Sequence, residues 1–198
     1  MVRPRWGGEA GLIRYADDFV GACQYQADAE RFYLELGQRL GKFGLELAAG
    51  KTRVIPFTRQ QVPGHTSFDF LGFEFHWGRD RAGKPHLKRR TSRKKLRNAL
   101  KRVTDWCKEK CRYRLKDMFR ELNAKLRGYY HYYGVNGNSA SLQEFFTCVM
   151  RILFNWLNRR SQRRSYTWTG FRDLLHHFRV ERPPIVGRPP TRLASGRA

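Results

Sequence analysis

The spacing of the hydrophobic residues changes near residue 90 of this 198-residue chain. Before that point, apolar and polar residues alternate over short runs, as they do in residues 68–77. Beyond it, apolar residues recur every three to four positions, as Leu96, Leu100 and Val103 do. Alternation matches the two faces of a strand, and the longer spacing matches one face of a helix. The sequence therefore predicts an α+β fold, in which β-hairpins and one helix precede an all-helical part.

Turn residues and apolar runs divide the first 80 residues into short elements. Asp17 and Asp18 stand between two apolar runs, which is typical of a hairpin turn, and Gly50, Lys51 and Thr52 indicate another turn. We expect a hairpin over residues 12–23, a helix over 28–43, strands at 45–47 and 54–55, and a second hairpin over 68–77 that continues beyond a turn at 81–85.

Capping signals mark the helices of the second part. Ser92 can cap the first of them, Gly134 follows the second, residues 141–144 form a capping box, and Thr169 can cap the last. We expect helices over residues 92–107, 115–133, 141–157 and 169–178, followed by an extended Pro-rich tail at 181–198.

All of the excess positive charge lies in the second part. Residues 1–80 hold ten basic and ten acidic side chains, whereas residues 81–198 hold 30 and seven. Such a surplus, interleaved with aromatic residues, favours a surface that neutralises phosphates, because self-repulsion otherwise weakens the compact state. A solvated basic face and an anionic membrane surface are the alternatives. The candidate RNA-binding residues are Arg93, Lys94, Lys95, Arg97, Lys101, Arg102 and Arg127.

The sequence shows no sign of secretion or membrane insertion. Its N-terminus lacks the order of charges and apolar residues of a signal peptide, and Arg, Lys or Gly interrupts every long apolar run. Cys23, Cys107, Cys111 and Cys148 show no paired CxxC spacing, so reduced thiols are expected. We expect a cytoplasmic protein.

Asp17 and Asp18 are the candidate catalytic residues. Two carboxylates about 4 Å apart repel each other by roughly 4 kcal/mol at an effective dielectric near 20, so a semi-buried pair calls for a cation or a proton. Oxygen ligands beside a phosphate-binding surface favour Mg²⁺, which acts in two-metal phosphoryl displacements. Taken alone, an Asp-Asp pair at a solvated turn is usually ordinary turn chemistry, which is the alternative interpretation.

The order of several segments resembles that of a known family. These segments are Arg14-Tyr15-Ala16-Asp17-Asp18-Phe19-Val20, Leu45-Glu46-Leu47 with Lys51-Thr52, Phe68-Asp69-Phe70-Leu71-Gly72-Phe73, and Leu126 to Gly134 with the helix that begins near Leu142. Together they resemble the reverse transcriptase of group II introns, a combined polymerase and maturase. The resemblance implies the C-terminal part of the palm at 1–80, the thumb or maturase-specific domain at 85–180, and a Pro/Arg-rich tail at 181–198.

The resemblance also implies roles for individual residues. Asp17 would be a direct ligand of Mg²⁺ in a two-metal site, and Asp18 its supporting carboxylate. Tyr15, Ala16 and Lys51 would contact substrate, and a solvated lysine beside a strand is the alternative for Lys51. Phe70, Leu71 and Gly72 would shape the primer grip, unless they simply belong to the core.

The family takes another metal-binding aspartate from a strand far upstream, together with its fingers domain. Because Met1 lies only 14 residues before Tyr15, we expect a C-terminal part: a truncated copy, a mis-called start or one half of a split enzyme. The incomplete site predicts that this chain alone does not polymerise. The resemblance implies that the complete enzyme is an RNA-directed DNA polymerase that also assists RNA splicing. It also implies that the enzyme is encoded by a mobile genetic element.

The implied partners are group II intron RNA, an RNA template with a DNA primer, and a polypeptide that supplies the fingers and the missing aspartate, in a bacterial ribonucleoprotein. The alternative function is a stand-alone RNA-binding, maturase-like module without polymerase chemistry. Another kind of DNA-binding protein has less support, because the sequence shows no convincing recognition helix or zinc motif.

Overall fold

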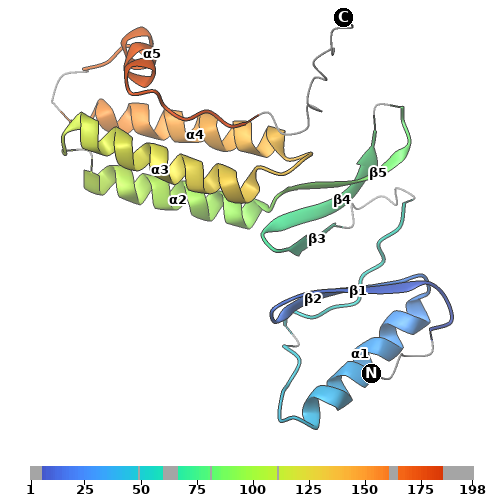
Figure 1. The fold of residues 1–198 in the computed structure, drawn as a ribbon. Helices are drawn as coiled ribbons and strands as arrows, with labels where there is room; N and C mark the ends of the chain where they lie inside the picture. Colours follow the sequence, from blue (N-terminus) through green and yellow to red (C-terminus); the bar gives the residue numbers. More distant parts are fainter. Residues whose placement is uncertain are drawn as a thin grey trace, which may run out of the picture. The chain divides into compact units, whose positions relative to one another are not determined.

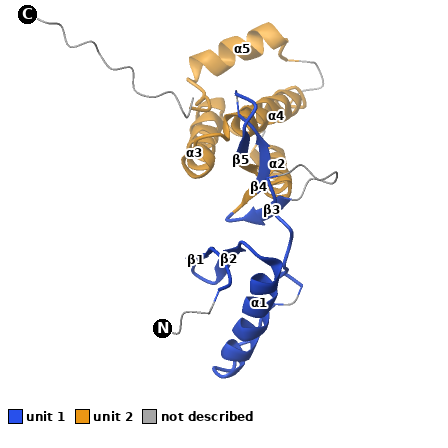
Figure 2. Ribbon diagram, turned by 90° about the vertical axis from the view of Figure 1, so that its right-hand side faces the viewer, with its two compact units in different colours: residues 1–71, 75–88 blue, residues 72–74, 89–198 orange. Residues whose placement is uncertain are grey.

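A computed structural model describes residues 6–48, 50–59, 67–80, 82–110, 112–160 and 165–184. The chain divides into two units (Figures 1 and 2). Unit 1 comprises residues 1–71 and 75–88, and unit 2 comprises residues 72–74 and 89–198. Strands and one helix come first and helices follow, so the α+β prediction is confirmed.

Unit 1 begins with the predicted hairpin and helix. Strands β1 (Ala10–Tyr15) and β2 (Asp18–Cys23) pair antiparallel, with Tyr15 opposite Asp18, and helix α1 (Gln26–Gly41) follows. The buried carboxylate of Asp28 accepts hydrogen bonds from the backbone N–H groups of Gly7 (2.9 Å) and Gly8 (3.2 Å), which fixes the chain before β1 against the first turn of α1.

The strands predicted at 45–47 and 54–55 are wrong. The described residues between α1 and residue 59 form turns and irregular structure, in which Leu45 and Val54 are exposed. The predicted turn is present, because the backbone N–H groups of Lys51 (2.8 Å) and Thr52 (2.9 Å) donate to the carbonyl of Ala48. An alternating run becomes a strand only when a neighbouring strand satisfies its backbone groups, and no described strand pairs with these segments.

The second predicted hairpin is confirmed as part of a three-stranded sheet. Its strands are β3 (Ser67–Phe70), β4 (Phe73–Arg79) and β5 (Pro85–Thr91), in the order β3-β4-β5. Leu71 (φ 49°) and Gly72 (φ 79°) connect the first two strands, and two positive φ angles are typical of a type I′ turn. Asp80 closes the next connection by accepting hydrogen bonds from the backbone N–H groups of Ala82 and Lys84, both at 2.8 Å.

Four helices carry the core of unit 2: α2 (Arg93–Lys110), α3 (Leu115–Tyr133), α4 (Ser139–Leu157) and α5 (Trp168–His177). The first three lie side by side, and α5 packs near the end of α4 (Figures 1 and 2). Every fully buried hydrophobic side chain that the structure describes belongs to this unit, and the predicted apolar stripes provide most of them. The buried hydrophobic residues are Leu96, Ala99, Val103, Trp106, Cys107, Met118, Phe119, Leu122, Leu126, Tyr130, Leu142, Phe145, Val149, Met150, Leu153, Phe154, Leu157 and Phe171.

The start of α4 differs from the prediction. The helix begins at Ser139 after Asn138, so the proposed capping box lies inside the helix and Ser141 is buried. The side chain of Asn138 makes no cap and instead joins three groups. Its Oδ1 accepts from the backbone N–H of Thr91 (2.8 Å), and its Nδ2 donates to Thr91 Oγ1 and to the carbonyl of Tyr133, both at 2.9 Å.

The cap of α5 is also shifted, because Thr167 precedes the helix and its Oγ1 accepts from the backbone N–H of Gly170 at 3.2 Å. The predicted cap, Thr169, therefore lies in the first turn of α5. Residues 185–198 of the predicted tail and Cys111 lie outside the described residues.

Candidate nucleic-acid interface

The two aspartates lie where the hairpin reverses, as predicted: Ala16 and Asp17 form the turn, and Tyr15 and Asp18 are the paired strand residues on either side of it. All four residues are exposed. Ala16 has a positive φ of 53°, and its carbonyl accepts a hydrogen bond from Nε of Arg14 at 2.7 Å, which braces the turn. The arrangement presents both carboxylates to solvent on a short connection.

The hairpin has one covered face and one open face. Phe32 of α1 lies 3.5 Å from the position that a Cβ would take on Gly21, so α1 covers the face to which Gly21 belongs. Side chains alternate between faces along a strand, and directly opposed residues share a face. Asp18 lies three residues from Gly21 and therefore on the other face, and Tyr15 shares that face because it is opposed to Asp18. On this face Tyr15 is 66% exposed and Ile13 is 65% exposed. The open face thus combines a carboxylate with apolar side chains.

The described residues do not complete a two-metal site. No group of three or more His, Cys, Asp or Glu side chains within them can hold a metal ion. Asp17 and Asp18 come from one turn, and two metal ions in an in-line displacement need carboxylates from more than one segment. Lys51 is exposed in its own turn. We therefore assign no step of nucleotidyl transfer to these residues alone.

Gly72, a predicted primer-grip residue, contacts α2 and α3. Its carbonyl accepts from the backbone N–H of Ser92 at 2.9 Å. A Cβ on Gly72 would lie 3.1 Å from the hydroxyl of Tyr133 and 3.8 Å from Cγ of Lys95, so a predicted RNA-binding lysine stands beside the predicted primer grip. Phe70 and Leu71 are half-buried.

Most of the tyrosine cluster at the end of α3 serves packing. Tyr129 stacks on Phe145 with ring centroids 3.6 Å apart, Tyr130 is buried, and Tyr133 is half-buried. Burial raises the pKa of the Tyr129 and Tyr130 phenols above the ordinary value. Tyr132 is 54% exposed and its ring is nearly parallel to that of Phe73, so it is the member best placed to contact a ligand.

Helix α2 presents a basic surface on the side away from the core. Its apolar residues are buried or, in the case of Leu100, half-buried, whereas all six predicted cations from Arg93 to Arg102 are exposed. Lys94, Arg97 and Lys101 follow one another at spacings of three and four, so they form a stripe along the helix, which we call the α2 cation stripe. None of these three forms an ion pair with any residue that the structure describes.

Other basic side chains form hydrogen bonds or ion pairs within the protein. Two nitrogens of the Arg90 guanidinium donate to the carboxylate of Glu74 at 2.8 and 2.9 Å. Arg127, a predicted RNA-binding residue, forms a longer pair with Glu181 at 3.5 Å. Arg89 donates a hydrogen bond to the carbonyl of Asn136 at 3.1 Å. The sequence did not indicate this contact, because a basic residue on a strand shows no pattern that distinguishes it from its neighbours.

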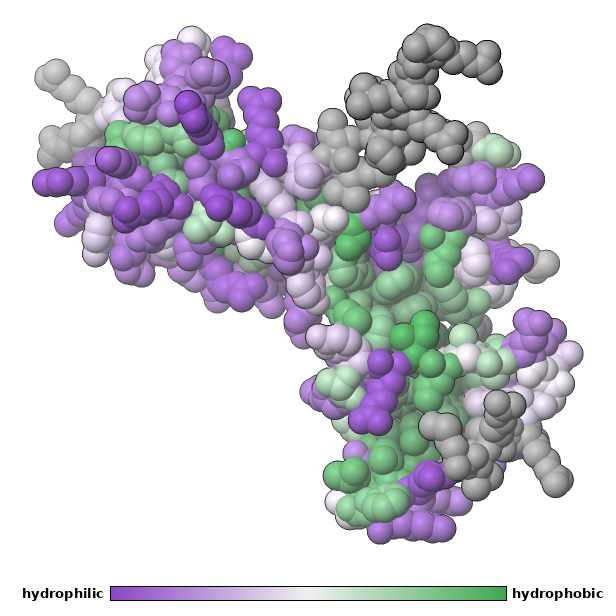
Figure 3. Space-filling model, in the orientation of Figure 1, coloured by the Kyte–Doolittle hydropathy of each residue, from purple (hydrophilic) through white to green (hydrophobic). Residues whose placement is uncertain are grey.

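The hydropathy of the two units differs. On the face drawn in Figure 3, hydrophilic side chains cover much of the helical unit, and hydrophobic side chains gather over unit 1. Leu12 (57%), Leu34 (64%) and Phe43 (72%) are among the exposed apolar residues of unit 1. On this face the two units therefore differ in hydropathy, as their sequences differ in net charge.

A search for membrane-spanning segments among the described residues finds no helix long and apolar enough to cross a bilayer.

Comparisons with known proteins identify the helical unit. A search of curated proteins finds no match. Residues 86–173 match the family model described as group II intron, maturase-specific domain, and this range runs from β5 into α5. The preceding hairpins and helix fit the end of a reverse-transcriptase palm, so the domain order agrees with a reverse-transcriptase-related protein. The chain therefore contains a group II intron maturase-specific domain at residues 86–173.

Proposed function

We propose that the helical unit binds group II intron RNA and supports splicing, as part of an RNA-directed DNA polymerase and maturase. The α2 cation stripe carries this proposal, because it is exposed, free of acidic partners in the described chain and part of the matched domain. Lys94 and Lys101 lie about 10 Å apart along the helix axis. Such a row can contact successive phosphates of one RNA strand, and Lys95 and Arg102 extend the surface towards Tyr133.

Binding of this kind has a measurable signature. Each neutralised phosphate releases condensed counterions, so the logarithm of the affinity falls linearly with the logarithm of the salt concentration. We expect the full chain to bind a structured RNA with a steep negative slope, measured by fluorescence anisotropy of a labelled RNA in a KCl titration. A flat slope would contradict the proposal.

The polymerase role belongs to a complete enzyme. We propose that Asp17 is a metal ligand there and Asp18 its supporting carboxylate, with Tyr15 and Ala16 beside the primer and nucleotide and Lys51 near the substrate phosphates. Phe70, Leu71 and Gly72 would form the primer grip for an RNA template and DNA primer. Bound Mg²⁺ would stabilise the leaving pyrophosphate. A further carboxylate must come from a segment or polypeptide outside the described residues.

This reasoning predicts that the chain by itself does not extend a primer. The assay supplies an annealed RNA template and DNA primer, deoxynucleotides and Mg²⁺ to the purified chain. Template-dependent extension that Asp17→Asn abolishes would show that the metal site is complete, and would overturn the prediction.

A stand-alone RNA-binding module is the second candidate function. The exposed Asp17-Asp18 pair favours it, because no third His, Cys, Asp or Glu of the described chain joins the pair to form a metal-binding group. Two variants separate the candidates in a splicing assay of intron RNA and in primer extension. If Asp17→Asn abolishes an activity that survives Lys94→Ala, the carboxylates form a catalytic site; if only changes in α2 matter, the function is binding.

The proposal also includes the domain limits 1–80, 85–180 and 181–198. It places the chain in a cytoplasmic ribonucleoprotein.

A further inference from the structure

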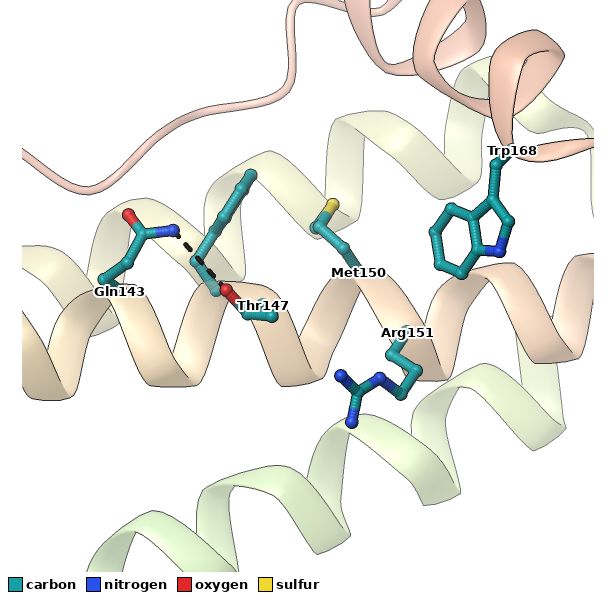
Figure 4. Close-up of a pocket in the computed structure, with 6 residues that line it drawn as sticks. Gln143, Thr147, Met150, Arg151 and Trp168 are labelled. Atoms are coloured by element: carbon teal, nitrogen blue, oxygen red, sulfur yellow. Dashed lines mark hydrogen bonds between the residues drawn. The ribbon is translucent and has the colours of Figure 1, made fainter.

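A groove lies between α4 and α5, within unit 2, and no residue of the α2 cation stripe lines it. Five residues of α4 and one of α5 enclose a volume of about 290 Å³. This volume lies near the lower end of the range for small-molecule sites, which is roughly 300–1,000 Å³, and suits a single planar ring system. The lining residues are Gln143, Phe146, Thr147, Met150, Arg151 and Trp168 (Figure 4).

Trp168 forms a flat wall at one end of the groove. Its indole stacks on Phe154 with centroids 3.9 Å apart and planes inclined by 12°, and Phe171 meets it edge to face at 5.8 Å. Phe154 and Phe171 are buried, yet Trp168 is 49% exposed. Because Phe154 covers one face of the indole, the exposed area includes the opposite face. The core therefore holds an aromatic surface in a fixed orientation towards solvent.

Polar groups share the rest of the groove with Phe146 and Met150. Figure 4 places Gln143 and Thr147 at the end far from Trp168, where the Gln143 amide donates to the Thr147 hydroxyl over 3.4 Å. That hydrogen bond is long, so both groups can exchange it for a ligand. Arg151 is exposed on the same helix, and no acidic residue lines the groove.

We propose that this groove binds one unpaired nucleobase of an RNA strand, stacked on Trp168, with Arg151 available to the adjacent phosphate. The proposal rests on the RNA-binding function proposed above and adds a second contact to it. Base stacking on aromatic side chains is a common mode of single-strand recognition. Charge favours an RNA occupant over an apolar peptide, because the groove offers a cation without an acid in a part of the chain with 30 basic and seven acidic residues.

The probe is a short single-stranded RNA with one 2-aminopurine, whose fluorescence falls when the base stacks on an aromatic ring. The full chain should quench this fluorescence. Trp168→Leu keeps an apolar cover on Phe154 but removes the flat ring, so quenching should disappear and binding should weaken about 5- to 150-fold, the range for one stacked base. Trp168→Phe should restore most of both signals. Tyr113→Leu is the matched control, because Tyr113 is a comparably exposed aromatic residue (51%) of the same unit outside the groove.

A second pair of variants serves if Trp168→Leu lowers the melting temperature. Thr147 lines the groove and Asn155 does not, yet both are exposed on α4. Thr147→Glu should weaken binding more than Asn155→Glu, although both add the same charge.

The outcomes separate the groove from the wider function. If the wild-type chain binds structured RNA with a steep salt slope but does not quench the probe, or if folded Trp168→Leu quenches it fully, the groove proposal is overturned and the α2 proposal stands. If quenching depends on Tyr113 as much as on Trp168, the contact is non-specific and the groove proposal is again overturned. If the wild-type chain binds no RNA, both proposals are overturned.

Discussion

The α2 cation stripe allows a quantitative test of the RNA-binding proposal. The perturbation replaces Lys94, Arg97 and Lys101 with alanine in one chain. Each phosphate contact contributes about 0.9 to the slope of log affinity against log salt for a duplex, or about 0.7 for a single strand. Loss of three contacts should therefore reduce the steepness of that slope by about 2 to 3 and weaken binding at every salt concentration below the point where the curves meet.

The same structure predicts that this variant stays folded. Lys94 with Arg97 and Arg97 with Lys101 are like-charge neighbours on the helix, and each such pair destabilises a helix by roughly 0.2–0.5 kcal/mol. Alanine has the highest helix propensity, and the three side chains are exposed. The free energy of unfolding should be unchanged or slightly higher, so weaker binding could not be attributed to unfolding.

Anisotropy of a labelled structured RNA in a KCl titration measures both slopes. The control variant replaces Arg39, Lys42 and Arg53, three exposed cations of unit 1, with alanine, so that both variants lose the same charge. If the control lowers the slope as much as the α2 variant, net charge rather than a defined surface drives binding. An α2 variant with the wild-type slope would refute the reasoning.

Three further predictions concern stability. Asn138→Ala removes three hydrogen bonds and leaves a buried backbone N–H without its partner, so the free energy of unfolding measured in urea should fall by about 2–4 kcal/mol; a loss under 1 kcal/mol would contradict the role given to Asn138. Gly72→Ala puts a Cβ at positive φ beside the Tyr133 hydroxyl, so it should cost about 1–2 kcal/mol in thermal unfolding, and Tyr133→Phe should recover part of the loss; full stability of the single variant would rule the contact out. Burial raises the pKa of Tyr129 and Tyr130 in the folded chain, so their contribution to stability is complete below the unfolded-state pKa of about 10 and is lost as pH rises further; unfolding monitored by circular dichroism should show stability falling above that pH, less steeply for Tyr130→Phe, and an identical pH profile would disprove it.

Local patterns predicted the elements that depend on local geometry. The hairpin around Asp17, the helix after it and the stripes of α2, α3 and α4 follow from hydrophobic spacing, because one face of each element must be buried whatever its partner is. Helix limits shifted by a few residues. Phe43, expected on the first helix, lies beyond its end and is exposed.

The errors occurred where a tertiary contact outweighed a local preference. The capping box expected at residues 141–144 lies inside α4, which begins after Asn138, and the Asn138 side chain joins Thr91 to Tyr133, residues far from each other in the sequence. Residues 45–47 alternate like a strand but find no described neighbouring strand with which to pair. Capping and pairing signals compete with such contacts, and a single sequence does not show which one is stronger.

The candidate sites likewise include features that the sequence alone determined and features that depend on tertiary contacts. The sequence by itself determined the surplus of cations, their place on the outer face of α2 and the adjacent carboxylates at the first turn, because composition and helical spacing decide these features. Only the tertiary structure decided that Lys95 stands beside Gly72, that Arg90 is occupied by Glu74, and that Trp168 closes a groove against α4. These contacts join residues distant in the chain, and their geometry exists only once the helices and strands have packed.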